Sequence, residues 1–72
     1  MGVIMDRQTV LEIFKAAGLN AHQAEQVGYL YKEMGMLTRT AQGGYTLTPR
    51  ALEPDTIRKA AANPLFTRFS NW

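Results

Sequence analysis

Apolar residues recur at helical spacing near the start of the chain. They are Val10, Leu11, Ile13, Phe14 and Ala17. The i, i+4, i+7 spacing within this set predicts a helix that buries one face in a core. Asp6 is one candidate N-cap, and a capping box of Thr9 with Glu12 is another, so the helix is expected to begin between residues 6 and 9. Gly18 is expected to end it.

A second helical pattern follows after a short gap. Its apolar positions are Ala24, Val27, Leu30, Tyr31 and Met34. Asn20 is the candidate N-cap, Gln23 can return the hydrogen bond, and Gly35 suits the left-handed residue that ends a helix. Gly28 lies inside this pattern, where glycine costs about 1 kcal/mol against alanine. Either the helix breaks at Gly28, or another group packs closely against it.

Beyond residue 35 the periodicity changes from helical to alternating. Residues 36–40 and 45–48 are rich in Thr, Leu and Tyr, they flank the pair Gly43 and Gly44, and Pro49 stops the second run. Alternation around a glycine turn predicts a β-hairpin.

Two registers of this hairpin compete. One pairs Thr40 with Tyr45 and places the two leucines on opposite faces. The other pairs Arg39 with Tyr45, and it sets Leu37 opposite Leu47. We favour the second register, because both leucines can then cover the helices and the stem of Arg39 can stack on the Tyr45 ring.

The last third of the chain predicts a short helix and an aromatic tail. The helix is expected over residues 57–62, either capped by Asp55 or carrying Pro54 in its first turn, and ended by Asn63 and Pro64. Exposed aromatic side chains form a sticky patch, so the tail is expected to pack on the core, on a second copy, or on another protein. The candidates for self-association are Leu65, Phe66, Phe69 and Trp72.

Length and composition indicate one small domain over residues 1–72, with a flexible start at 1–5. The chain is 46% hydrophobic and has seven aromatic residues, which is too many for a disordered segment. It has no apolar run of the roughly 20 residues that cross a bilayer, and no secretory signal pattern, so no membrane partner is expected. With no Cys, a cytoplasmic location is expected.

No arrangement of side chains indicates an enzyme. His22 is the only histidine, no cysteine is present, and the six carboxylates are scattered, so no metal, cofactor or small-molecule substrate is expected. The two glycines at 43 and 44 precede a strand, which is unlike a phosphate-cradling loop. Charge is uneven: residues 1–36 hold three basic and four acidic side chains, whereas residues 37–72 hold five basic and two acidic.

The segment from Tyr29 to Leu52 resembles the end of the recognition helix, the wing and the following turn of bacterial winged helix-turn-helix proteins. The matching positions are Gly35, Leu37, Arg39, Gly43, Gly44, Tyr45, Leu47, Thr48, Pro49 and Arg50. The resemblance implies an α+β, winged-helix-like domain: two or three helices, a two-stranded β-hairpin wing and a short C-terminal helix.

The same resemblance implies a bacterial or phage transcription-regulating or accessory protein. It would contact duplex DNA with its second helix and its wing. A homodimer through the C-terminal aromatic residues is also expected, because two copies would double the sparse phosphate contacts of one copy. The expected contacts are Gln23, Gln26, Lys32, Thr38, Arg39, Thr40, Gln42, Gly43, Gly44 and Arg50. The alternative is a protein–protein interaction module, such as an adaptor, subunit or inhibitor, without nucleic-acid contact; the low net charge of +2 favours it.

Overall fold

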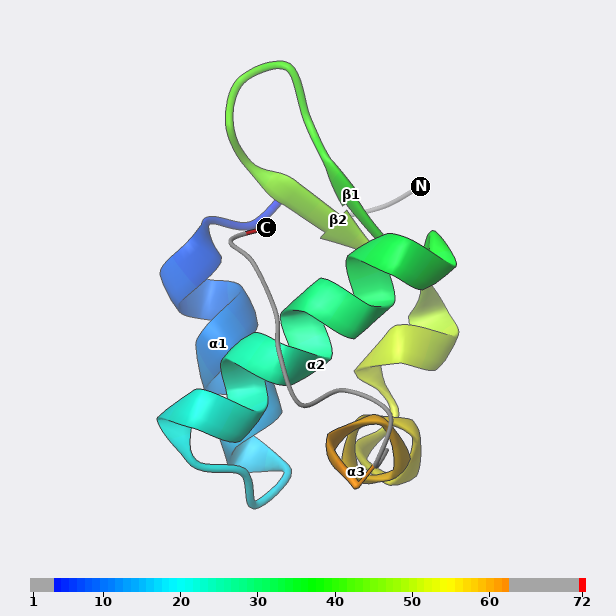
Figure 1. Cartoon of the computed structure of the whole chain (residues 1–72). Coiled ribbons are helices and arrows are strands. Elements are labelled where there is room, and N and C mark those ends of the chain that lie inside the picture. Colours follow the sequence, from blue (N-terminus) through cyan, green and yellow to red (C-terminus); the bar gives the residue numbers. More distant parts are fainter. Residues whose placement is uncertain (1–3, 63–71) are drawn as a thin grey trace.

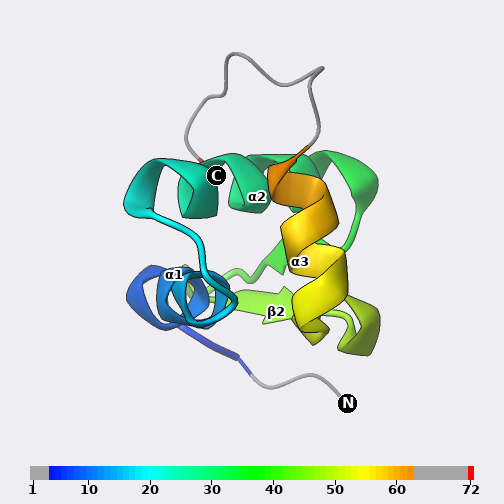
Figure 2. The same ribbon diagram turned by 90° about the horizontal axis from the view of Figure 1, so that it is seen from below.

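The computed structural model describes residues 4–62 and 72, and it has an α+β fold with three helices and one hairpin (Figure 1). This agrees with the predicted fold class. Helix α2 contacts α1, α3 and the first strand, and Figure 2 shows it running across one side of these elements. The elements in chain order are α1 (Arg7–Ala16), α2 (Ala21–Met34), β1 (Leu37–Arg39), β2 (Tyr45–Leu47), the 3-10 helix η1 (Pro49–Leu52) and α3 (Pro54–Ala61).

Helix α1 begins at the earlier of the two predicted caps. The Asp6 carboxylate accepts a hydrogen bond from the main-chain N–H of Thr9 at 2.8 Å. Hydrogen bonds from Thr9 also hold the pKa of the Asp6 carboxyl below its ordinary value. Thr9 therefore lies inside the helix, and the alternative capping box was wrong. The chain turns beyond α1 at Gly18, whose φ is +103°.

Helix α2 has the predicted ends. Asn20 and Gln23 form a reciprocal capping box, with hydrogen bonds of 2.8 and 3.0 Å, and Gly35 closes the helix at a φ of +79°. Gly28 does not break the helix. It is buried, and the second of the two predicted explanations applies: the ring of Trp72 packs against it.

The hairpin has the favoured register. Leu37 pairs with Leu47 and Arg39 pairs with Tyr45, so both leucines are buried on the side that faces the helices. Gly43 adopts a φ of +87°, which a tight turn requires and a side chain disfavours.

Met5, which belongs to the start that was predicted to be flexible, is paired with the hairpin. Its main chain exchanges two hydrogen bonds with Tyr45, of 2.7 and 2.8 Å, and forms an antiparallel bridge alongside β2. A short third segment therefore extends the hairpin, which the sequence did not indicate. Residues 1–3 lie outside the described part of the chain.

The segment after the hairpin forms two short helices, η1 and α3. Thr48 caps η1 through its hydroxyl group, which accepts from the Ala51 N–H at 3.3 Å. Helix α3 begins at Pro54, three residues earlier than predicted, with Pro in its first turn and no side-chain cap. Asp55 is therefore not the cap, and it pairs instead with Arg58. The predicted stop at residues 63 and 64 lies outside the described residues.

The core gathers the apolar faces of all these elements. Phe14 of α1 meets Tyr31 of α2 edge to face, with ring centroids 5.5 Å apart. Met34 was predicted to be in the core, but its position near the end of α2 leaves it 60% exposed. The buried cluster comprises Val10, Leu11, Phe14, Leu19, Ala24, Val27, Tyr31, Leu37, Tyr45, Leu47, Ala51, Ile57 and Trp72.

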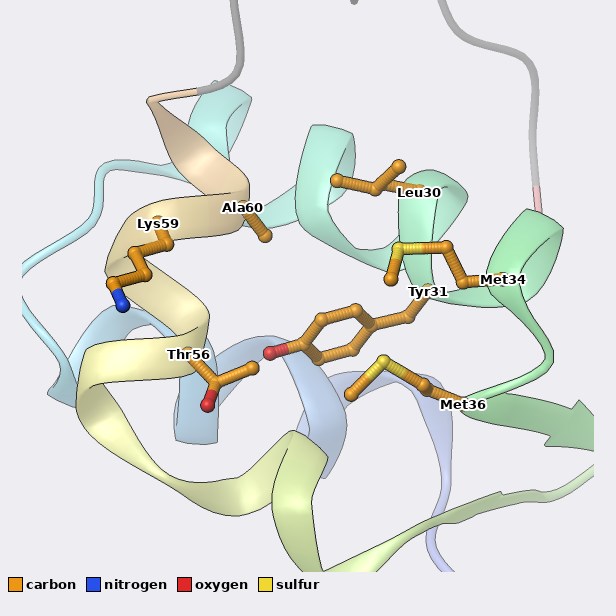
Figure 3. A pocket seen from close by; sticks show the side chains of 7 residues that line it. All are labelled: Leu30, Tyr31, Met34, Met36, Thr56, Lys59 and Ala60. Atoms are coloured by element: carbon orange, nitrogen blue, oxygen red, sulfur yellow. The ribbon is translucent and has the colours of Figure 1, made fainter.

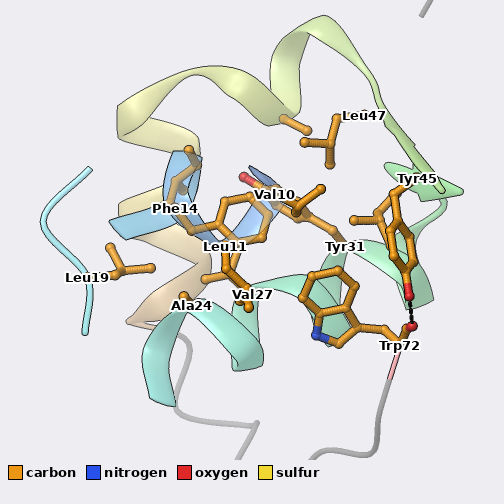
Figure 4. Close-up of a cluster of buried hydrophobic side chains, with 13 residues drawn as sticks. Val10, Leu11, Phe14, Leu19, Ala24, Val27, Tyr31, Tyr45, Leu47 and Trp72 are labelled. Carbon is orange, nitrogen blue, oxygen red and sulfur yellow. Dashed lines mark hydrogen bonds between the residues drawn. The ribbon is translucent and has the colours of Figure 1, made fainter. Parts of the chain in front are cut away.

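Trp72 completes this core from the far end of the chain (Figure 4). Its indole N–H donates to the main-chain oxygen of Glu25 at 3.0 Å, and its ring lies 5.1 Å from the Tyr45 ring. The Tyr45 hydroxyl donates to the main-chain oxygen of Trp72. The Arg7 guanidinium lies 4.8 Å from the indole centroid.

The aromatic tail was expected to pack on the core, on a second copy, or on another protein; Trp72 packs in the core of its own chain. It is only 4% exposed, so its side chain offers no surface for self-association in this arrangement. The other three residues of that prediction, Leu65, Phe66 and Phe69, lie outside the described part of the chain. Among residues 4–62, no helix is long and apolar enough to pass through a bilayer.

The hairpin register makes a direct prediction about stability. Leu37→Ala is expected to lower the free energy of unfolding by about 3 kcal/mol, because a buried leucine loses its packing. Thr38→Ala, one position along and exposed, is expected to change it by less than about 1 kcal/mol. Urea denaturation measures both, and equal losses would contradict this register.

Candidate nucleic-acid interface

The turn of the hairpin projects beyond the helices (Figure 1). Its surface carries a hydroxyl, a guanidinium and an amide, from Thr38, Arg39 and Gln42, all exposed, with Gly43 at the turn. These groups are hydrogen-bond donors of the kind that contact phosphate oxygens. A glycine turn without a side chain also allows close approach to a sugar-phosphate backbone.

Thr40 and Gly44, also predicted contacts, shape the turn instead. The Thr40 hydroxyl accepts from the Gly44 N–H at 3.0 Å, and the Thr40 N–H donates to the Gly44 oxygen at 2.8 Å. A Cβ atom on Gly44 would lie 2.6 Å from the Ile4 Cγ2, so the segment before α1 packs tightly on the turn. Both residues are partly buried and act by holding the loop in place.

Arg39 and Arg50 are exposed and form no ion pair with any residue of the described chain. Arg7 and Arg58, by contrast, are paired with carboxylates. The stacking of the Arg39 stem on Tyr45 stays a prediction; the structure places the Tyr45 ring against Trp72. The Arg39 guanidinium is thus left for solvent or a ligand.

The predicted contacts on α2 do not share one face. Gln23 and Lys32 are nine residues apart, which is about half a turn from alignment on a helix, so they project to opposite sides. Gln23 also uses its side-chain oxygen in the capping box. Gln26 is partly buried, and Lys32 alone of the three is exposed.

Trp72 covers part of the same helix. Its indole lies over Gly28, about one turn before Lys32, and donates a hydrogen bond to the main-chain oxygen of Glu25, about two turns before Lys32. The ring therefore covers part of the surface of α2 on the side of Gly28 and Glu25. Sequence reasoning missed this contact, although a glycine inside a helical pattern together with a single tryptophan was the available signal.

A small apolar cleft lies between the end of α2 and α3 (Figure 3). Its volume is about 190 Å³, and Met34 stands exposed at its side. The sequence did not indicate this cleft, because the two helices that form it are distant along the chain. The lining residues are Leu30, Tyr31, Met34, Met36, Thr56, Lys59 and Ala60.

One group in this lining is energetically unusual. Tyr31 is 1% exposed, and its hydroxyl has no hydrogen-bond partner among the described residues. Burial raises the pKa of the Tyr31 phenol to about 12, because the phenolate would lose its hydration.

Chemistry beyond hydrogen bonding and charge is not indicated by the described side chains. No three His, Cys, Asp or Glu residues within 4–62 and 72 lie together as a metal site would need. In comparisons with known proteins, no family model, no curated protein and no solved structure matches the chain.

The buried phenol predicts an alkaline loss of stability. The pKa of the Tyr31 phenol is about 12 in the folded chain and 10.0 in the unfolded chain. The free energy of unfolding is therefore unaffected by this group below pH 10, and it falls as the pH rises from 10 through 12. The decrease in the free energy of unfolding should approach about 3 kcal/mol.

The matched variant is Tyr31→Phe. It removes an unpartnered hydroxyl, so the free energy of unfolding at pH 7 is expected to rise by about 1 kcal/mol. Urea denaturation from pH 7 to 12 measures the difference between the two chains. A difference that stays constant across this range would contradict a buried, unpaired phenol.

Proposed function

We propose that this chain is a small winged-helix-like DNA-binding protein with a regulatory or accessory role. The order of its elements supports this reading: two consecutive helices, α1 and α2, precede the hairpin β1–β2, and the layout is compatible with a helix-turn-helix followed by a wing. The observation that carries the proposal is the projecting hairpin with an exposed arginine that has no carboxylate partner in the described chain.

The hairpin is the main DNA contact in this proposal. The Arg39 guanidinium and the neighbouring hydroxyl and amide groups donate to phosphate oxygens, and Arg50 adds a second charge at the base of the hairpin. These contacts orient the protein on the duplex without reading its sequence. Lys32 adds a phosphate contact from the exposed side of α2.

A dimer fits the modest charge of the chain. One copy carries a net charge of +2, which supplies few phosphate contacts. Two copies on neighbouring half-sites double the contacts and gain affinity through their linkage. The proposal therefore includes a homodimer on DNA.

A protein–protein interaction module is the second candidate. It is favoured by the apolar cleft beside α3, where Met34 is 60% exposed and offers a flexible thioether to an apolar side chain of a partner. Under this alternative the protein does not bind duplex DNA at any salt concentration.

Titration of random-sequence duplex DNA distinguishes the two candidates. We expect binding at 50 mM salt that weakens steeply toward 200 mM, since phosphate contacts release counterions. Fluorescence anisotropy of labelled DNA measures it. Absence of binding at low salt would reject the DNA-binding proposal.

Two arginine variants test which surface makes the contact. Arg39→Ala and Arg50→Ala are each expected to lower affinity about tenfold on every sequence and to reduce the salt slope by about 1. The control is Lys15→Ala, which removes an exposed charge in the last turn of α1, at the end remote from the hairpin. Unchanged circular dichroism shows that the fold persists, and equal losses in all three variants would indicate unspecific charge effects.

A further inference from the structure

We propose that the groove between α1, α2 and the hairpin is a binding site for an indole with a neighbouring carbonyl group. Trp72 of the same chain occupies it, and free tryptophan or a tryptophan-bearing peptide is the class of ligand it would accept in its place. Its walls are Arg7, Glu25, Gly28 and Tyr45. The inference does not depend on DNA binding.

The floor of the groove is shaped for a flat ring. A Cβ atom at Gly28 would lie 2.0 Å from Cε2, 2.3 Å from Cζ2 and 2.5 Å from Nε1 of Trp72. No larger residue fits beneath the ring without moving it. Glycine is unfavourable in the middle of a helix, so the close approach of the ring supplies a physical reason for glycine at this position.

The polar contacts select an indole over other aromatic rings. The indole nitrogen is a donor only, and a buried donor needs an acceptor. The main-chain oxygen of Glu25 accepts this hydrogen bond at 3.0 Å. Phenylalanine has no group for this acceptor.

Two further contacts recognise the ring face and the main chain. The Arg7 guanidinium, held by the Glu25 carboxylate at 3.0 Å, lies 4.8 Å from the indole centroid, where a cation is attracted to the ring. The Tyr45 hydroxyl donates to the main-chain oxygen of Trp72. All of these contacts are made to the indole and the main-chain oxygen of Trp72. A separate molecule that has an indole and a carbonyl oxygen can therefore make the same contacts with the Glu25 oxygen, the Arg7 guanidinium and the Tyr45 hydroxyl.

The test empties the groove and adds a ligand. Trp72→Ala is expected to lower the melting temperature by about 10 °C or more, because a large buried ring is lost. N-acetyl-L-tryptophanamide at about 100 times its dissociation constant is expected to restore about 10 °C. Ligand emission at shorter wavelength on binding gives an independent readout, since Trp72 is the only tryptophan of the chain.

Related probes identify what the groove recognises. Indole is expected to bind more weakly than N-acetyl-L-tryptophanamide, because it lacks the oxygen for Tyr45. 1-Methylindole, which cannot donate to Glu25, is expected to bind at least tenfold more weakly than indole. Tighter binding of L-tryptophan would identify the free amino acid as the ligand, and tighter binding of N-acetyl-L-tryptophanamide would identify a peptide.

Two variants keep the test valid if the truncated side chain unfolds the domain. Gly28→Ala combined with Trp72→Ala fills the floor and favours the helix, so this chain should fold but bind none of the probes. Gly28→Ala alone should expel Trp72 and shift its emission to longer wavelength, whereas the control Glu33→Ala, on the exposed side of α2, should not. Unshifted emission in Gly28→Ala, or absence of probe binding by a folded Trp72→Ala chain, would overturn the proposal.

Discussion

The burial of α2 is the constraint on which the rest of this structure depends. In a domain of this size only one core can form, and α2 is the element that contacts α1, α3 and β1 together. The edge-to-face contact of Tyr31 with Phe14 lies toward its C-terminal end, and Gly28 near its middle allows the Trp72 ring to pack against the helix. The exposed residues of the helix lie at its two ends, at Ala21 and His22 and at Lys32, Glu33 and Met34, whereas its middle part is buried or partly buried.

Because much of α2 packs in the core, the candidate DNA contacts lie mainly on the hairpin. A two-stranded hairpin can bury one face and leave its turn in solvent, since successive side chains point to opposite sides. Leu37 and Leu47 serve the core, while Thr38 and the turn remain exposed. In the proposed function the hairpin can therefore contact a phosphate backbone without loss of core packing.

Three buried aromatic residues differ in whether their polar groups have hydrogen-bond partners. The Tyr45 hydroxyl and the Trp72 indole N–H both have partners, and together they connect the hairpin to α2 through Trp72. The Tyr31 hydroxyl is buried without one in the described chain. A satisfied network fixes the arrangement of elements, whereas an unpaired hydroxyl lowers stability and marks the cleft beside α3 as an imperfectly packed part of the core.

Local features could be predicted from the sequence: both ends of α2, and the hairpin register, which the two leucines decide. For α1 the sequence left two candidate caps open, and the structure uses Asp6. These features depend on contacts between residues close in sequence, or on the alternation of side chains along a strand, so they can be predicted from the sequence. Three features became known only from the tertiary structure: the Trp72 ring against Gly28, the pairing of Met5 with Tyr45, and the exposure of Met34. They depend on which distant segments of the chain contact each other. The apolar periodicity predicts that one face of a helix is buried, but it does not identify the residues that cover that face.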